Sequence, residues 1–252
     1  MPVLHDRIAR KTPVADALTA GARLAVFDLD NTLLTGDSDT LWCDYLLQRK
    51  ELPTTFGDTN RVLEQQYRAG QATPAAFSNF FASTLAGRSP LEWQRIRNDF
   101  LADAIRPRIP AAARALVAQH QTQGDLLVLS SATNRFLCEL TAAELGFAHL
   151  IATELSVGVD GRFTGATEGT LNMREGKVQR LHDWLAEQGV SAVAAVLADT
   201  IFYSDSINDL PLLLAVGTPV AVDPDAQLLM HAEQRGWPVL RLQRPFIPEI
   251  SS

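Results

Sequence analysis

The chain has 252 residues, of which 46% are hydrophobic and 20% charged, so it can bury a sizeable core as one large domain or as one domain with an insertion. Its formal net charge of −7 argues against a basic surface that binds nucleic acid. No run approaches the roughly 18–20 apolar residues of a membrane span, and the N-terminus lacks the apolar centre of a secretory signal. Cys43 and Cys138 lie far apart, without ligand-spaced neighbours, so neither a disulfide framework nor a zinc site is expected. We therefore expect a cytoplasmic protein without a nucleic-acid or membrane partner.

Short apolar runs that end in polar residues recur along the chain and predict buried strands. In chain order the runs are residues 24–27, 126–129, 201–203, 220–222 and 239–242. Helical patterns lie between them, at residues 111–121, 136–145 and 177–188, and a glycine that can end a helix follows each pattern. Alternating strands and helices predict an α/β fold with a doubly wound, Rossmann-like parallel sheet.

The stretch from about residue 39 to residue 105 interrupts this alternation, because it contains several helical patterns but no strand pattern. Its aromatic residues are expected to form a core of their own rather than a ligand cage; they are Tyr45, Phe77, Phe80, Phe81, Trp93 and Phe100. The sequence therefore predicts an all-helical cap over residues 37–106, inserted into an α/β core of residues 1–36 and 107–252.

Three other segments fall outside the alternation. Residues 158–170 predict a β-hairpin, because two short segments flank the turn signal Asp160-Gly161. The first 20 residues and the tail after Leu242 carry no functional pattern, although Pro245 and Pro248 indicate an irregular end.

Two acids, Asp28 and Asp30, follow directly after the apolar run LAVF, at the end of the first predicted strand. Ligands bind at the carboxyl ends of strands in open α/β sheets. One carboxylate of such a pair can be ionised for metal binding and nucleophilic attack, while the other holds a proton for a leaving group. Taken alone, the segment DLDNT is equally consistent with a solvated turn followed by an Asn-Thr helix cap.

A hydroxyl group follows another predicted strand. Ser130 comes directly after the run LLVL, and its hydroxyl together with the next main-chain N–H groups can bind an anion. On this segment alone, an ordinary helix cap by Ser131 or Thr133 is the better explanation.

Charged residues also begin a predicted helix and end a predicted strand. Lys177 lies in the first turn of a helix, where it opposes the helix dipole, so a phosphate opposite it would explain its place; a solvated surface lysine is the commoner explanation. Asp205 and Asp209, with Asn208 beside them, crowd acids at a strand end, which is unfavourable unless a cation neutralises them. Oxygen-rich sites of this kind suit Mg²⁺.

In this order, the segments FDLDNTLL, LVLSSA, EGKVQRL and YSDSINDLPLL resemble the four motifs of the haloacid-dehalogenase superfamily, over residues 24 to roughly 223. The helical insertion after the first motif and the DGRFTG hairpin before the lysine resemble the phosphoserine-phosphatase-like subfamily. The resemblance implies a Mg²⁺-dependent phosphatase that hydrolyses a phosphomonoester of a small metabolite through an aspartyl-phosphate.

The resemblance also implies a role for each motif residue. Asp28 would be the nucleophile, and Asp30 would protonate the leaving alkoxide and then activate water, for which its pKa should be raised by its acidic neighbours. Asp209 would hold Lys177 in place. The implied ligands of Mg²⁺ are Asp28, Asp205 and Asp30, the last through its main-chain carbonyl. The implied phosphate-binding residues are Thr32, Ser130, Ser131, Lys177 and Asn208.

The chain departs from the subfamily pattern at a few positions. Ser204 replaces the glycine before the first acid of the last motif, and Ser131 replaces the glycine of the second motif. Asp37 stands where phosphoserine phosphatases place a substrate-reading glutamate. Candidates for their carboxylate-binding arginine are Arg61 and Arg68. Asp37 predicts a cationic or hydroxylated leaving group, as in histidinol phosphate, phosphoserine or phosphoethanolamine-like compounds.

Two other functions fit the same motifs. A phosphotransferase would form the same aspartyl-phosphate but pass the group to an alcohol, and phosphate release in the presence of an added acceptor distinguishes it from a hydrolase. A catalytically inactive protein that binds a phosphorylated ligand is the other alternative. The presence of Asp28, Asp30, Lys177 and Asp205 together argues against it.

Overall fold

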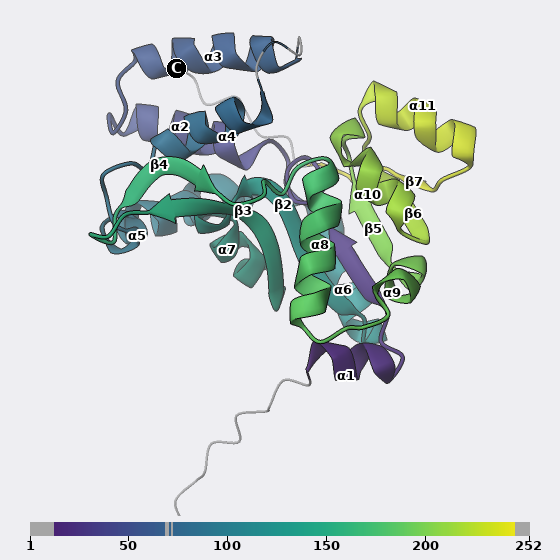
Figure 1. The fold of residues 1–252 in the computed structure, drawn as a ribbon. Coiled ribbons are helices and arrows are strands. Elements are labelled where there is room, and N and C mark those ends of the chain that lie inside the picture. Colours follow the sequence, from purple (N-terminus) through teal and green to yellow (C-terminus); the bar gives the residue numbers. More distant parts are fainter. Residues whose placement is uncertain (1–12, 69–70, 72, 245–252) are drawn as a thin grey trace, which may run out of the picture.

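The computed structural model describes residues 13–68, 71 and 73–244, and a seven-stranded sheet forms its centre (Figure 1). The strand order is β4-β3-β2-β1-β5-β6-β7, and neighbouring strands run parallel except for the antiparallel pair β3–β4. The strands are β1 (Leu24–Phe27), β2 (Leu126–Asn134), β3 (His149–Val157), β4 (Phe163–Glu168), β5 (Ile201–Ser204), β6 (Thr218–Val222) and β7 (Val239–Leu240). The prediction of an α/β fold with a largely parallel sheet is confirmed.

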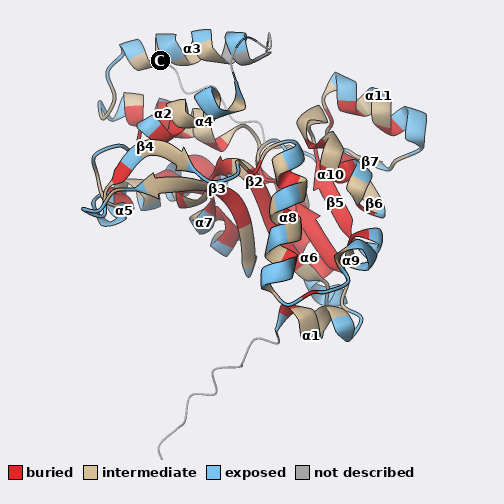
Figure 2. Cartoon of the chain, in the orientation of Figure 1, coloured by how far each residue is buried: buried red, intermediate tan, exposed pale blue. Residues whose placement is uncertain are grey.

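The central strands β1 and β5 are buried on both faces, which explains why they appear in the sequence as short apolar runs (Figure 2). Along β1, Ala25 and Phe27 point into one hydrophobic cluster. Leu24 and Val26 point into a second cluster on the opposite face. This alternation fixes the direction of every side chain that follows the strand, including those of the acids after Phe27.

Helices cover the two faces of the sheet. In Figure 1, α8 lies in front of the sheet and α6 and α7 lie behind it. The helices outside the insertion are α1 (Val14–Thr19), α6 (Ala111–Gln123), α7 (Arg135–Glu144), α8 (Glu175–Glu187), α9 (Val193–Asp199), α10 (Leu210–Ala215) and α11 (Ala226–Arg235). The described residues contain no helix that is long and apolar enough to cross a membrane.

The insertion after β1 is helical along its described residues. It contains α2 (Ser38–Gln48), α3 (Thr55–Arg68), α4 (Pro74–Ser83) and α5 (Pro90–Phe100), followed by a π-helical turn (Leu101–Ile105) and a 3-10 turn (Arg106–Arg108). The start of α5 is specified locally, because Ser89 and Glu92 form a reciprocal capping box and Pro90 occupies the first helical position.

The β3–β4 hairpin is longer than predicted. Its turn does contain Asp160-Gly161, but its first strand begins at His149, upstream of the predicted range. The strand was missed because its first half pairs with β2 and its second half with β4, so burial changes along it and no single periodicity appears.

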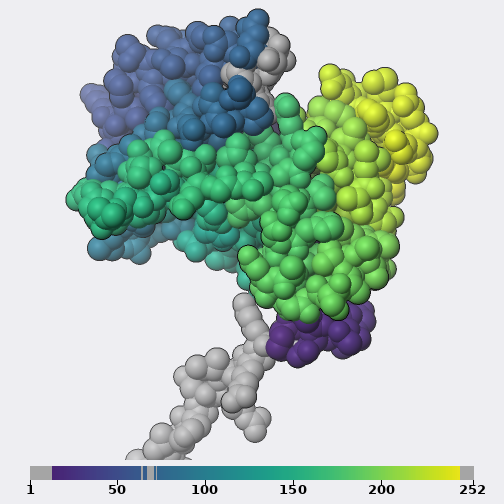
Figure 3. Space-filling model, viewed as in Figure 1, coloured from purple at the N-terminus to yellow at the C-terminus, as the bar shows by residue number. Residues whose placement is uncertain are grey.

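The hairpin contacts the helical insertion directly. The side-chain oxygen of Asn79 on α4 accepts hydrogen bonds from the main-chain nitrogen and the hydroxyl of Thr167, at 2.8 and 2.9 Å. Main-chain bonds also join Phe163 to Gly87 and Arg88. In Figure 3 the insertion, in blue, lies against the teal surface of the hairpin. The insertion is thus braced by the sheet as well as by its own connections.

The sequence led us to expect that the aromatic side chains of the insertion form a core of their own, but only some of them group together. Phe81 contacts Phe77 and Phe80, at ring-centroid distances of 5.0 and 5.5 Å. Trp93 and Phe100 belong to the same buried cluster as Phe27 beneath the sheet. Phe77 is partly exposed and lines the cleft described below. Because the cluster is continuous, the division into a cap of residues 37–106 and a core of residues 1–36 and 107–252 remains a prediction.

Candidate active site

Asp28 is the first residue after β1, and it lies between the ends of two neighbouring strands. The register pairs Phe27 with Leu129 of β2 and with Tyr203 of β5. The main-chain nitrogen of Asp28 donates to the carbonyl of Tyr203 at 2.9 Å, which extends this register by one residue. Asp28 is buried, and this burial raises its pKa to about 6, although the nearby charge of Lys177 opposes the shift.

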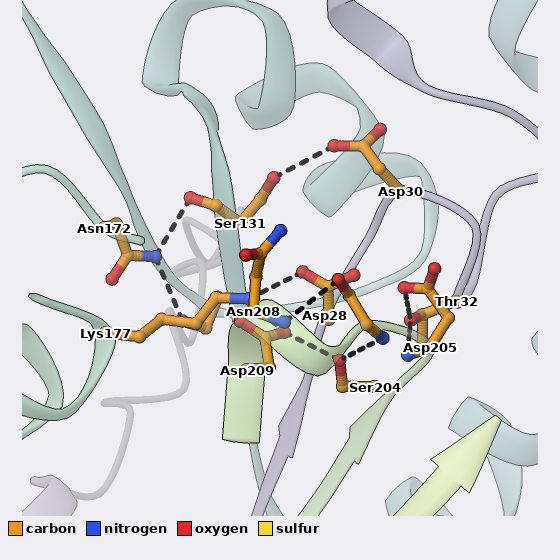
Figure 4. A network of polar contacts seen from close by, with 12 residues as sticks. Asp28, Asp30, Thr32, Ser131, Asn172, Lys177, Ser204, Asp205, Asn208 and Asp209 are labelled. Carbon is orange, nitrogen blue, oxygen red and sulfur yellow. Dashed lines mark hydrogen bonds and ion pairs between the residues drawn. The ribbon is translucent and has the colours of Figure 1, made fainter. Parts of the chain in front are cut away.

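Lys177 joins two of the acids (Figure 4). It lies in the first turn of α8, and its Nζ donates to Oδ1 of Asp28 at 2.8 Å and to Oδ2 of Asp209 at 2.6 Å. Its side chain is only 2% exposed. Burial by itself lowers the pKa of this amine, but the charges of Asp209 and Asp28 outweigh it and raise the pKa above its usual range. The unusual position of a lysine at a helix start is therefore explained by two buried carboxylates.

Asp30 turns toward the end of β2. Its Oδ1 accepts from the main-chain nitrogen of Ser38 at 2.7 Å, and its Oδ2 accepts from the hydroxyls of Thr133 at 2.9 Å and Ser131 at 3.3 Å. Burial raises the pKa of Asp30 to about 7, with Asp37 and Asp28 adding to the effect. A carboxyl group with this pKa can hold or release a proton near neutral pH.

Thr32 contacts Asp205 rather than the cleft. Its hydroxyl donates to Oδ1 of Asp205 at 3.0 Å and accepts from the main-chain nitrogen of the same residue at 3.0 Å. The Thr32 side chain is fully buried, so its orientation does not support the predicted phosphate contact. Its position instead fixes the orientation of Asp205, whose pKa is raised by burial and by the charge of Asp28.

The two serines at the end of β2 point in opposite directions, because successive strand residues alternate. The hydroxyl of Ser130 lies 3.1 Å from the amide nitrogen of Asn172, and neither of the two serines is part of the cleft lining. The hydroxyl of Ser131 faces Asp30. The predicted phosphate contact of Ser130 is therefore not supported by its orientation, whereas Ser131 remains a candidate.

Asn172 was missed in the sequence, where nothing marked it as special. It is fully buried, and its amide nitrogen also donates to the carbonyls of Ser131 at 2.9 Å and Ile151 at 3.0 Å. It thereby ties β2, at Ser131, to the neighbouring strand β3 (Figure 4).

The last motif surrounds Asp209. The hydroxyl of Ser204 donates to Oδ2 of Asp209 at 2.7 Å, so the residue that replaces a glycine here also supports the acid that holds Lys177. Asn208 lines the cleft, and its side-chain oxygen accepts from Nε of Arg174 at 3.3 Å.

Asp37 and Asp39 stand at the start of α2. Asp37 caps this helix by accepting from the main-chain nitrogen of Thr40 at 2.8 Å. Asp39, which sequence reasoning missed, lies 3.1 Å from the Thr133 hydroxyl that also contacts Asp30. One hydroxyl hydrogen cannot serve two carboxylates, so the pair is best satisfied when one of the two acids is protonated. Burial, together with Asp37 and Asp30, raises the pKa of Asp39 accordingly.

A cleft of about 280 Å³ lies between the strand ends and α4. Six aspartates and one lysine line it, together with Phe77, Ser78 and Met173. The aspartates are Asp28, Asp30, Asp37, Asp39, Asp205 and Asp209. Arg61 pairs with Asp58 on α3 and does not line the cleft, and the side chain of Arg68 lies outside the described residues.

The donor set fits a divalent cation. In the described part of the chain, no group of three or more His, Cys, Asp or Glu side chains has the arrangement of a metal site. Mg²⁺ does not require one, because it commonly takes one or two carboxylates and keeps several waters. Asp28 and Asp205 line the same cleft, and the charge of one raises the pKa of the other. The cleft therefore holds more buried carboxyl groups than Lys177 alone could neutralise if all of them were ionised.

A parallel α/β sheet with a buried aspartate–lysine pair and further acids at its carboxyl edge defines a hydrolase-type site beneath a helical insertion. The chain belongs to the haloacid dehalogenase-like hydrolase family, whose model matches residues 25–214. It is a phosphatase of this family.

Similar proteins agree with this assignment. A histidinol-phosphatase of Neisseria meningitidis serogroup C (strain 8013) is 41% identical over 221 residues, which cover 87% of this chain and 99% of the relative. A crystal structure of a protein with unknown function from Bordetella pertussis Tohama I matches with a TM-score of 0.81 and 41% identity, over 87% of this chain and 98% of that one. A substrate-bound phosphoserine phosphatase shares the fold, with a TM-score of 0.62 at 17% identity over 87% and 92% of the two chains.

Proposed function

We propose that this phosphatase is a Mg²⁺-dependent phosphomonoesterase in which Asp28 is the nucleophile. The observation that carries the proposal is the buried Asp28–Lys177–Asp209 chain beside Asp30, a second acid whose pKa is raised to about 7. One acid is thereby placed to attack a phosphoryl group while the other carries a proton.

The proposed reaction has two steps. An oxygen of Asp28 attacks phosphorus, the bond between phosphorus and the alcohol oxygen breaks, and Asp30 gives its proton to the leaving alkoxide. Asp30, now ionised, takes a proton from a water molecule, which attacks the same phosphorus and releases phosphate from Asp28. Lys177, Asn208 and the hydroxyl of Ser131 would hold the phosphoryl oxygens. Asp28, Asp205 and the main-chain carbonyl of Asp30 would hold Mg²⁺. The cation would neutralise negative charge on the oxygens of the transferred phosphoryl group.

Mg²⁺ should stabilise the fold more at pH 8 than at pH 5. The pKa values of Asp28, Asp30, Asp39 and Asp205 are raised in the folded protein. The metal-free fold therefore binds protons that the unfolded chain has released, and it loses stability as the pH rises from about 4 to about 7. A cation offsets this loss when the acids are ionised and competes with protons when they are not.

The measurement is the thermal unfolding midpoint with and without MgCl₂ at both pH values. At a concentration near a hundred times Kd we expect a rise of about 5 °C or more at pH 8, and about half of that or less at pH 5. The variant Asp205→Asn removes a proposed Mg²⁺ ligand, so it should show a smaller rise of the unfolding midpoint at pH 8. Equal shifts at the two pH values would contradict buried acids as the binding groups.

We further propose that the leaving group is an amino alcohol, with histidinol phosphate as the first substrate to test. Asp37, at the start of α2, adds a carboxylate to the lining of the cleft, and the alcohol part of the substrate would lie beside it. A protonated amine is the complementary group. The 41% identical relative named a histidinol-phosphatase supports the same choice.

The variant Asp37→Asn should separate recognition of the amine from the chemistry. Asn also caps helices well, so α2 should keep its start while losing one charge. We expect kcat/KM for histidinol phosphate to fall by about tenfold or more, because a charge-assisted hydrogen bond is lost. Hydrolysis of p-nitrophenyl phosphate should change much less, because this substrate has no amine and its phenolate leaves with little proton donation from Asp30.

Asp44→Asn provides a matched control, since Asp44 is exposed on the same helix and does not line the cleft. A fall of equal size for both substrates in Asp37→Asn would show that Asp37 supports the fold of the site rather than recognising the amine.

Phosphotransfer is tested in the same assays by adding an acceptor alcohol and measuring the amounts of released alcohol and released phosphate. A phosphotransferase would release more alcohol than phosphate.

A further inference from the structure

The tail after β7 returns to the loop that follows the nucleophile. Arg244 lies at this point, and its side chain is 21% exposed. Its Nη1 donates to the carbonyl of Leu34 at 2.8 Å, and its Nη2 donates to the carbonyls of Thr32, at 3.2 Å, and Asn31. The guanidinium of Arg244 thus binds three main-chain carbonyls of the loop after Asp30.

The guanidinium is itself fixed by Asp223 at the end of β6. Its Nε donates to Oδ2 of Asp223 at 2.9 Å, and the same oxygen accepts from the main-chain nitrogen of Leu242 at 3.2 Å. Asp223 therefore anchors both the tail and the arginine that the tail carries. Charge-assisted hydrogen bonds of this kind are stronger than neutral ones.

The loop connects this arginine to the acids. Arg244 holds the main chain of Thr32, and the hydroxyl of Thr32 holds Asp205 through two hydrogen bonds. Asn31, the other carbonyl partner, directly follows Asp30 and adopts a left-handed backbone conformation with φ 57°. A shift of this loop would move Asp30 and Asp205 relative to Asp28.

We infer that Arg244 is a positioning residue that sets the spacing of the metal-binding and proton-transferring acids. The inference rests on the proposed function, because it concerns Asp205 as a ligand of Mg²⁺ and Asp30 as the acid. Only a planar fork with several N–H groups can reach the carboxylate and the carbonyls together, so a lysine does not replace it.

The test compares Arg244→Ala and Arg244→Lys with Arg241→Ala. Arg241 provides a matched control, because its Nη1 lies 3.9 Å from the other oxygen of Asp223 and its side chain is 57% exposed, and among the described residues it makes no hydrogen bond to the loop. Mg²⁺ binding is measured by titrating the thermal unfolding midpoint of each full-length variant, and kcat and KM are measured with p-nitrophenyl phosphate.

In Arg244→Ala we expect the Mg²⁺ concentration at half-saturation to rise, and kcat to fall, by about tenfold or more, as is usual when a residue that orients a metal ligand is removed. Arg244→Lys should shift both quantities in the same direction, and it decides the question if Arg244→Ala does not fold. In Arg241→Ala, KM, kcat and the Mg²⁺ concentration at half-saturation should all stay within about twofold of the values for the unmodified protein.

Two failures can be told apart. If the unmodified protein shows neither a Mg²⁺-dependent midpoint nor Mg²⁺-dependent hydrolysis, the proposed function is wrong. If it shows both, and the Arg244 variants lower only the midpoint without changing half-saturation or kcat, Arg244 is a purely structural residue and the inference is overturned.

Discussion

Asp28→Asn is expected to reduce phosphatase activity by about 10³-fold or more, which corresponds to about 4 kcal/mol of transition-state stabilisation. The amide oxygen of Asn is a poor nucleophile, and the Asn side chain also lacks the negative charge that would hold Mg²⁺. Because Asn has nearly the same shape, the fold should be retained. Steady-state hydrolysis of p-nitrophenyl phosphate and of histidinol phosphate measures the loss, and the unfolding midpoint verifies the fold.

Asp183→Asn is the matched control, because Asp183 is exposed on α8, where it accepts a hydrogen bond from Gln179 at the surface. It should leave both activities unchanged. Residual activity of Asp28→Asn close to that of the unmodified protein would remove Asp28 from the role of nucleophile. Trapping a labelled phosphoryl group on the unmodified protein, and not on the variant, would locate the intermediate.

Lys177→Met should weaken both activity and stability. Met fills a similar volume but leaves Asp28 and Asp209 buried without their shared cation. Breaking a buried ion pair from one side typically costs about 3–5 kcal/mol, and losing one preorganised donor costs about 10²–10³-fold in kcat. Urea unfolding and phosphatase assays measure the two effects.

The stability loss in Lys177→Met should shrink as the pH falls from 8 to 5. The pKa of Asp28 is already raised to about 6 by burial when Lys177 is present, and it rises further without the lysine. A protonated carboxyl no longer needs a cation, so acid relieves the penalty. Arg180 lies on the same helix as Lys177 and forms a partly exposed pair with Glu154 on β3, so Arg180→Met should cost about 1 kcal/mol or less. A pH-independent loss in Lys177→Met would contradict an electrostatic origin.

Much of the site could be predicted because parallel strands bring their carboxyl ends to one edge of a sheet. Asp28 and Asp205 follow apolar runs that became β1 and β5, and these strands are neighbours. Lys177 could be singled out because its charge opposes the dipole of the helix that it begins. Local patterns of this kind need no knowledge of distant contacts.

The errors arose where the direction of one side chain decides the role. Ser130 and Ser131 are indistinguishable by type, but β2 continues to Asn134, and the strand alternation turns only Ser131 toward Asp30. Thr32 follows the acids in sequence like a phosphate-binding residue, but the loop after β1 turns its hydroxyl to Asp205. Neither orientation follows from composition or spacing.

The sequence by itself thus determined the α/β class, the order of the motifs and the four charged residues Asp28, Asp30, Lys177 and Asp205, because periodicity and strand ends are local properties. Only the tertiary structure decided how these charges are balanced. It brought Asn172 to Ser131 of β2, Asp39 to the hydroxyl shared with Asp30, and Arg244 to the loop after Asp30. Hydrogen bonds and desolvation act over a few ångströms, and such distances between residues far apart in the chain are set by packing alone.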